Sequence, residues 1–84
     1  RQLAMEGRTH GVRVNSISPG VIETKQTQGF LKAPEWSSTM MDKIMIGRFG
    51  KPDDVSVAAA FLASDESSYI TATDIQVDGG LTAW

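Results

Sequence analysis

The sequence predicts an α/β fold, and we expect its 84 residues to form the carboxyl-terminal part of a larger domain. Residues 12–18 and 73–78 are rich in β-compatible or alternating apolar residues and end at glycine or proline, which is typical of strands. The connection between them is long and helical, which favours a parallel pair. Because parallel sheets are normally buried on both faces, two strands alone indicate that further strands complete the sheet.

Composition excludes several classes of function. The net charge is −2 and the pI is near 5.1, with no basic patch, so neither a nucleic acid nor an anionic membrane surface is indicated as a partner. The absence of cysteine excludes disulfides and thiolate chemistry. No apolar run reaches membrane-spanning length and no signal peptide begins the chain, so a cytoplasmic setting is expected. The one histidine, His10, is interpreted as a solvated loop residue, and no metal site is expected.

Residues 1–24 are expected to form a helix end, a strand and the loop that leaves it. Gly7 is placed to end the helix in the left-handed conformation. Pro19 fixes its own φ, and Gly20 permits a sharp turn or the close approach of a ligand. Ligands of open parallel sheets bind beyond the carboxyl ends of the strands, which would place residues 19–24 at the working edge. The alternative is an ordinary strand exit through a Pro-Gly turn, and spacing alone favours it.

Residues 25–46 form a long excursion of the kind that serves as a lid or a binding loop. Pro34 suits the first position of a helix, and Trp36, Met40 and Ile44 recur at helical spacing through residue 46. These side chains could line an adaptable apolar pocket or belong to a plain core, and helical spacing alone favours the core. The polar lead-in, which contains Gly29, favours the lid.

Residues 47–84 are expected to hold a helix, the last strand and a short tail. Pro52 suits the first position of the helix, which should run to residue 63 or 64. Two adjacent apolar stripes lie on it: Val55, Ala58, Ala59 and Leu62 in one, and Val57, Ala60 and Phe61 in the other. Such a wide apolar arc predicts cover on two sides, by the sheet and by either a partner subunit or another part of a longer chain. A tail that ends on Trp84 is predicted to be packed.

Taken together, these segments resemble the short-chain dehydrogenase/reductase family. The matching phrases, in the family's order, are Asn15-Ser16-Ile17-Ser18-Pro19-Gly20-Val21-Ile22-Glu23-Thr24, Gly47-Arg48-Phe49-Gly50-Lys51-Pro52-Asp53-Asp54-Val55, Phe61-Leu62-Ala63-Ser64-Asp65, Tyr69-Ile70-Thr71 and Val77-Asp78-Gly79-Gly80. Together they cover nearly the whole chain. The departure is Ala72, where the family usually has glycine, so the local backbone there is in doubt.

The resemblance implies a doubly wound, Rossmann-like sheet of seven parallel strands, of which residues 12–18 and 73–78 would be the sixth and seventh. It also implies that NAD or NADP binds with its nicotinamide end against Pro19, Gly20, Val21, Ile22 and Thr24. Residues 25–46 would be the substrate loop, with Phe30, Trp36 and Met40 as candidate contacts to a small alcohol or ketone. Helix 53–64 and strand 73–78 would form the subunit contact of a homo-oligomer, a dimer or a tetramer.

The family's catalytic residues have no match among these residues. The family carries a glycine-rich phosphate turn and a Tyr-x-x-x-Lys pair, whereas the one tyrosine here, Tyr69, is followed four residues later by Thr73. We therefore predict that the segment alone transfers no hydride. The leading hypothesis is part of an NAD(P)-dependent oxidoreductase. The alternatives are a truncated, non-catalytic assembly or binding module and, less favoured, a small-molecule binding protein.

Overall fold

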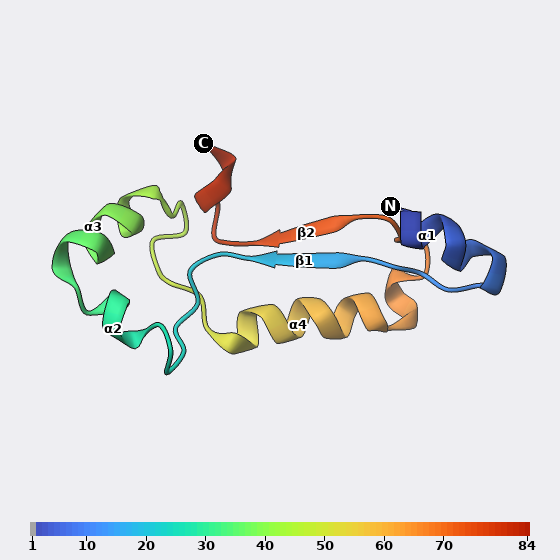
Figure 1. Ribbon diagram of the computed structural model, residues 1–84, viewed down its shortest axis with the longest axis horizontal. Coiled ribbons are helices and arrows are strands. Elements are labelled where there is room, and N and C mark those ends of the chain that lie inside the picture. The colour runs from blue at the N-terminus through green and yellow to red at the C-terminus, as the bar shows by residue number, and fades with distance from the viewer. Residues whose placement is uncertain (1) are drawn as a thin grey trace.

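The computed structural model describes residues 2–84 and contains a two-stranded parallel sheet flanked by helices (Figure 1). Strand β1 is Ser16–Pro19 and strand β2 is Asp74–Val77, paired from Ser16↔Asp74 to Pro19↔Val77. The predicted parallel pair is therefore confirmed. In chain order the helices are α1 (Gln2–Gly7), η1 (Arg8–His10), α2 (Gln28–Leu31), α3 (Pro34–Lys43), α4 (Pro52–Ala63), η2 (Asp65–Ser67) and η3 (Leu81–Ala83).

Both strands are shorter than the sequence predicts, and their regular pairing begins only after Ala72. Its φ is +61°, in the left-handed region, so the chain before β2 turns instead of remaining extended. The approach is held by mixed contacts: the Ala72 N–H donates to the Val14 carbonyl at 2.8 Å, and the Val14 N–H donates to the Thr71 hydroxyl at 3.1 Å. Residues 12–15 therefore lie beside residues 71–73, which precede β2, without forming a regular ladder of backbone hydrogen bonds.

Two helix ends also differ from the sequence prediction. Gly7 has a right-handed φ of −62°, and the left-handed residue is Gly11, with φ of +68°. The Val12 carbonyl oxygen lies 2.6 Å from where a Cβ of residue 7 would be, so glycine is needed there for close approach. Helix α3 ends at Lys43 because Ile44 is extended, so residues 44–46, which were predicted to be helical, lie outside the observed helix.

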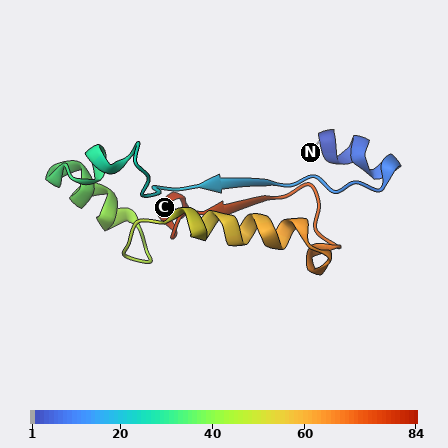
Figure 2. The ribbon, with the colours of Figure 1, turned by 90° about the horizontal axis from the view of Figure 1, so that it is seen from below.

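Helix α4 packs along both strands, while α1 lies beyond their amino ends on the other side of the sheet (Figures 1 and 2). In the first predicted stripe of α4, the side chains of Val55, Ala58 and Leu62 are half-buried, whereas Ala59 is exposed. In the second stripe Val57 and Phe61 are 66% and 41% exposed. The structure thus covers one of the two predicted apolar faces.

Arg13 and Asn15, which precede β1, make hydrogen bonds to the end of α4 and to the segment before β2. The Arg13 guanidinium donates to the Leu62, Ser64 and Ile70 carbonyls at 3.0, 3.2 and 3.1 Å, which satisfies acceptors at the end of α4. Asn15 donates to Ile70 O and accepts from the Thr73 N–H. Neither residue was identified from the sequence.

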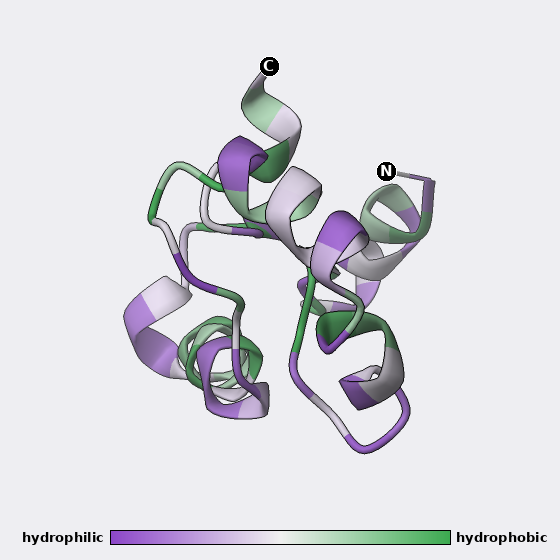
Figure 3. Cartoon of the chain, turned by 90° about the vertical axis from the view of Figure 1, so that its left-hand side faces the viewer, coloured by the Kyte–Doolittle hydropathy of each residue, from purple (hydrophilic) through white to green (hydrophobic). Residues whose placement is uncertain are grey.

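The described residues form a small, open core. The buried side chains are those of Ala4, Ile44, Phe49 and Ser67. The radius of gyration is 15.7 Å, against about 12 Å for a compact domain of this length. The accessible surface of 6349 Å² exceeds the roughly 4,900 Å² of a compact monomer of this mass. Hydrophobic stretches are spread over separate helices and loops (Figure 3).

The tail is tethered without being packed. Trp84 is 78% exposed, so the prediction of a packed end is wrong, although its indole Nε1–H donates to the Lys43 carbonyl at 2.6 Å. Asp78 caps the tail by accepting from the Gly80 and Thr82 N–H groups at 3.0 Å and from the Thr82 hydroxyl, which lowers the pKa of the Asp78 carboxyl. No helix among residues 2–84 is long and apolar enough to cross a membrane.

Candidate functional site

The candidate site is the loop that leaves β1 at the carboxyl edge of the sheet. Gly20 continues the pairing, since its N–H donates to the Val77 carbonyl at 3.0 Å. A Cβ on Gly20 would lie 2.6 Å from the Asp78 Cβ. The glycine is therefore required by the neighbouring strand end, and its missing side chain does not by itself indicate a ligand.

The next residues are fixed by a bridge to the segment before α4. The Gly50 N–H donates to the Val21 carbonyl at 2.9 Å, and its carbonyl accepts from the Glu23 N–H at 2.8 Å. A Cβ on Gly50 would lie 2.6 Å from the Ile22 Cδ1, so a larger residue would require the Ile22 side chain to move. The bridge thus holds the backbone of Ile22 at a set position beyond the sheet.

Two backbone donors of this loop remain available. Among residues 2–84 neither the Val21 nor the Ile22 N–H donates to a protein acceptor. An unpaired backbone donor beyond the carboxyl end of a parallel strand is suited to a polar ligand group. A primary carboxamide, which accepts through oxygen and donates through nitrogen, fits these donors together with a carbonyl of the same loop.

A threonine pair closes the loop. The Thr27 hydroxyl donates to the Ile22 carbonyl at 2.6 Å and accepts from the Thr24 N–H at 2.8 Å. The Thr24 hydroxyl lies 3.3 Å from both the Thr27 hydroxyl and the Thr27 N–H. Sequence reasoning identified Thr24 but missed Thr27, although the Thr-x-x-Thr spacing, which allows hydroxyl contacts to nearby backbone groups, was the signal for it.

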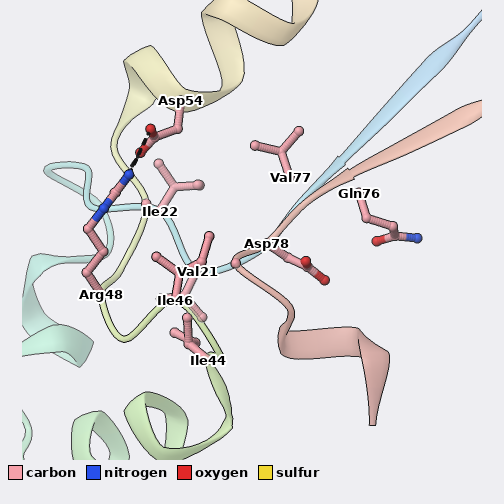
Figure 4. A pocket seen from close by; sticks show the side chains of 11 residues that line it. Val21, Ile22, Ile44, Ile46, Arg48, Asp54, Gln76, Val77 and Asp78 are labelled. Carbon is pink, nitrogen blue, oxygen red and sulfur yellow. Dashed lines mark hydrogen bonds and ion pairs between the residues drawn. The ribbon is translucent and has the colours of Figure 1, made fainter.

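A cavity of about 250 Å³ lies beside Val21 and Ile22 (Figure 4). Ile44 and Ile46 add to its apolar lining, and the Arg48–Asp54 ion pair, 2.9 Å long, stands to one side. Pro19, Gly20 and Thr24 do not line this cavity. The structure therefore brings two of the five predicted cofactor residues into the cavity, together with the chain that returns from α3.

The ion pair fixes the segment before α4. Both Arg48 Nη atoms donate to the Asp54 carboxylate, at 2.9 and 3.1 Å, and the Lys51 N–H donates to the same carboxylate at 2.7 Å. The hydrogen bond from Arg48, followed by the one from Lys51, lowers the pKa of Asp54 to about 2. The carboxylate also sits in the first turn of α4, where negative charge is favourable.

The predicted lid residues divide into two groups. Phe30 and Trp36 lie together, with ring centroids 6.1 Å apart, and Trp36 stacks on Phe49 at 6.3 Å with an interplanar angle of 24°. Met40 is half-buried but belongs neither to this stack nor to the cavity lining. Phe49 was missed, because a single aromatic residue between two glycines carries no periodic signal.

Other chemistry is absent from the described part of the chain. Within residues 2–84 no group of three or more His, Asp or Glu side chains is placed to hold a metal ion. His10 is exposed in η1, and Tyr69 is fully exposed, at 102%. The site therefore consists of backbone donors, a cavity lined by both apolar and polar side chains, and an aromatic stack.

Comparison with known proteins places this geometry in a family. Residues 1–82 match the family described as enoyl-(acyl carrier protein) reductase. The chain is 43% identical over its whole length to galactitol 2-dehydrogenase (L-tagatose-forming) of Cereibacter sphaeroides, covering 33% of that protein. It is 48% identical over 79 residues, 93% of its length, to the 3-oxoacyl-[acyl-carrier-protein] reductase FabG of Thermotoga maritima, covering 31% of that protein.

Solved structures agree in fold. A putative 2-deoxy-D-gluconate 3-dehydrogenase from Agrobacterium tumefaciens with bound NADP superposes with a TM-score of 0.94 at 35% identity, over 99% of this chain and 34% of that one. 4-Hydroxyisoleucine dehydrogenase complexed with NADH gives 0.93 at 36% identity, over 99% and 34%. The chain thus spans about one third of the length of its relatives. Its strand pair and helices are a partial α/β unit of a Rossmann-like sheet, and the chain belongs to the short-chain dehydrogenase/reductase family.

Proposed function

We propose that this chain supplies the carboxyl-terminal third of an NAD(P)-dependent oxidoreductase, which transfers a hydride between a nicotinamide cofactor and an alcohol or ketone. The observation that carries the proposal is the pair of unused backbone donors at Val21 and Ile22, beyond the carboxyl end of a parallel strand. Relatives of the same fold hold NADP or NADH, as their descriptions state.

The residues of the loop would divide the work of holding the nicotinamide. The Val21 and Ile22 N–H groups would donate to the carboxamide oxygen, and the Ile22 carbonyl, which already accepts from Thr27, has a second lone pair for the carboxamide nitrogen. Pro19 and Gly20 would fix the exit angle of the loop, and the Thr24 hydroxyl, which lies 3.3 Å from the Thr27 hydroxyl, would offer a further polar group. The bound nicotinamide would supply or accept the hydride, and these residues would set which ring face is presented.

Residues 25–46 would form the substrate lid, and α4 with β2 the contact to a second copy. The lid proposal rests on Phe30 and Trp36, which stand on helices outside the strand pair. The contact proposal rests on the uncovered second stripe of α4, with Val57 and Phe61 exposed. A dimer or tetramer formed through this face, in a cytoplasmic setting, stays a prediction.

A chimera tests the function directly. The 84 residues would replace the aligned residues of Thermotoga maritima FabG, with which 79 residues align at 48% identity. We expect the chimera to bind NAD(P)H, detected by nicotinamide fluorescence, and to reduce a 3-oxoacyl substrate. A folded chimera without cofactor binding would contradict the proposal.

A matched pair of variants isolates the backbone donor. Ile22→Pro removes one unused N–H and spares both bonds of the Gly50 bridge, which use the Val21 carbonyl and the Glu23 N–H. The loss of one net hydrogen bond, about 1–1.5 kcal/mol, predicts roughly a tenfold rise in the cofactor Kd. Ile22→Val keeps the donor and should leave Kd within about twofold. Equal Kd values for the two variants would exclude the backbone donor as a cofactor contact.

A non-catalytic assembly or binding module remains the second candidate. It is favoured by the exposed apolar stripe of α4. A chimera that folds and associates through α4, but neither binds NAD(P)H nor turns over substrate, would support the module.

A further inference from the structure

Helices α2 and α3 form an arm, defined as residues 28–43, that lies beyond the carboxyl ends of the strands (Figures 1 and 2). The two helices pack mainly on each other, whereas α4 packs on β1 and β2. An arm attached to the body chiefly through its two connections needs a side-chain joint if it is to keep one position.

The joint is the aromatic stack. Phe49 is 7% exposed and belongs to the segment before α4, and Trp36 of α3 stacks on its ring at a centroid distance of 6.3 Å. The ring of Phe30, in α2, also lies near Trp36: the two ring centroids are 6.1 Å apart, and the ring planes are tilted by 49°. The three rings therefore run outward from a buried anchor, through α3, to α2.

The anchor is fixed by the same backbone that forms the candidate nicotinamide loop. Arg48 Nη1 donates to the Phe49 carbonyl at 3.0 Å while its guanidinium is held by Asp54. The next residue, Gly50, is bonded to the carbonyl of Val21. Phe49 is thus the neighbour in sequence of Gly50, whose bridge to Ile22 fixes the position of the loop.

We propose that Phe49 is a positioning residue: it seats Trp36, and with it the arm, at a fixed distance from the loop that presents Val21 and Ile22. The proposal rests on the proposed function, since the arm then stands over the substrate. Substrate affinity should depend on the stack. Cofactor affinity should depend instead on the backbone of Ile22, which the Gly50 bridge and the Thr27 hydroxyl hold in place.

The test uses the FabG chimera, and its own activity tests the proposed function separately. In an active chimera, Phe49→Leu should raise the KM for the carbonyl substrate by about 2- to 10-fold, the change that corresponds to losing one aromatic pair. The cofactor Kd and kcat should stay within about twofold. Phe49→Tyr, which keeps the ring, should restore KM. Tyr69→Leu, a loss of an aromatic ring at a fully exposed position, is the control and should leave all three unchanged.

A second readout does not depend on activity. Trypsin can cleave after two exposed lysines, Lys25 just before the arm and Lys32 within it. Cleavage at these sites should be faster in Phe49→Leu than in Tyr69→Leu. If Phe49→Leu fails to fold, Trp36→Leu removes the same stack from its partly exposed side. An unchanged KM together with unchanged cleavage would overturn the proposal. A rise in cofactor Kd equal to the rise in KM would also overturn it, because Phe49 would then support the cofactor loop itself.

Discussion

Replacing Ala72 by glycine should stabilise the fold, although it removes a methyl group. Ala72 has φ of +61° and is the one residue other than glycine with positive φ among residues 2–84. Its conformation is held by the 2.8 Å hydrogen bond from its N–H to the Val14 carbonyl, so the turn cannot relax without losing that bond. Left-handed backbone costs an L-residue about 1–2 kcal/mol. Glycine avoids this cost but loses roughly 0.5–1 kcal/mol because its unfolded state has more conformational entropy. The free energy of unfolding should therefore rise by about 0.5–1 kcal/mol.

The assay is thermal unfolding of the chimera, followed by circular dichroism at fixed protein concentration. For a protein of 150–250 residues the predicted gain corresponds to a rise in Tm of about 1–4 °C. Ala59→Gly is the matched control, because Ala59 is exposed within α4 and glycine in a helix interior costs up to about 1 kcal/mol. The same chemical change should therefore shift Tm in opposite directions. A fall in Tm for Ala72→Gly would refute the view that this turn is strained.

Three further outcomes follow from the same contacts. The lowered pKa of Asp54, about 2, means that its contribution to stability is complete above the unfolded value of 3.8 and is lost as pH falls toward 2; an NMR titration of the α4 amides should show this, and Asp54→Asn should abolish the pH dependence. Arg13→Lys cannot reproduce the fork to three carbonyls and should cost about 1.5–3 kcal/mol in urea unfolding; a loss under 0.5 kcal/mol would contradict the capping role. Gly20→Ala forces a Cβ to within 2.6 Å of Asp78 and should cost about 1–3 kcal/mol, whereas Gly29→Ala, at a position with open space, should not.

The element order could be predicted because its signals are local. Pro34 and Pro52 each begin a helix, as their fixed φ and missing donor favour, and the turn at Gly79 and Gly80 ends the second strand. The parallel pairing followed from the length of the helical connection alone. Motif matches added the family, which the comparisons confirm.

The misplaced details depend on contacts between distant residues. Gly7 is glycine because the Val12 carbonyl approaches it, and Gly20 because Asp78 does, and no local pattern separates such close approach from a need for positive φ. The burial of Phe49 depends on Trp36 arriving from α3. Trp84 is exposed and is tethered through a hydrogen bond from its indole to the Lys43 carbonyl, a contact between residues far apart in the sequence.

The sequence predicted two parts of the candidate site: the loop after Pro19, and the rings of Phe30 and Trp36. Val21 and Ile22 could be placed at the sheet edge because a strand before Pro19 fixes where the chain emerges. The Gly50 bridge could not be predicted, since it requires the folded path of the loop, whereas Thr27 was missed although its spacing from Thr24 is visible in the sequence. The second stripe of α4 remains uncovered in the described residues, and its partner stays a prediction.

The proposed function depends above all on a contact between the Ile22 N–H and a bound nicotinamide carboxamide. The most direct measurement is the amide ¹H–¹⁵N spectrum of the chimera, labelled with ¹⁵N-isoleucine and titrated with NADH. We expect a downfield shift of the Ile22 amide proton on saturation, with the amides of Ile17 and Ile75, which belong to β1 and β2, nearly unchanged. An Ile22 resonance that does not move while NADH saturates the protein would contradict it.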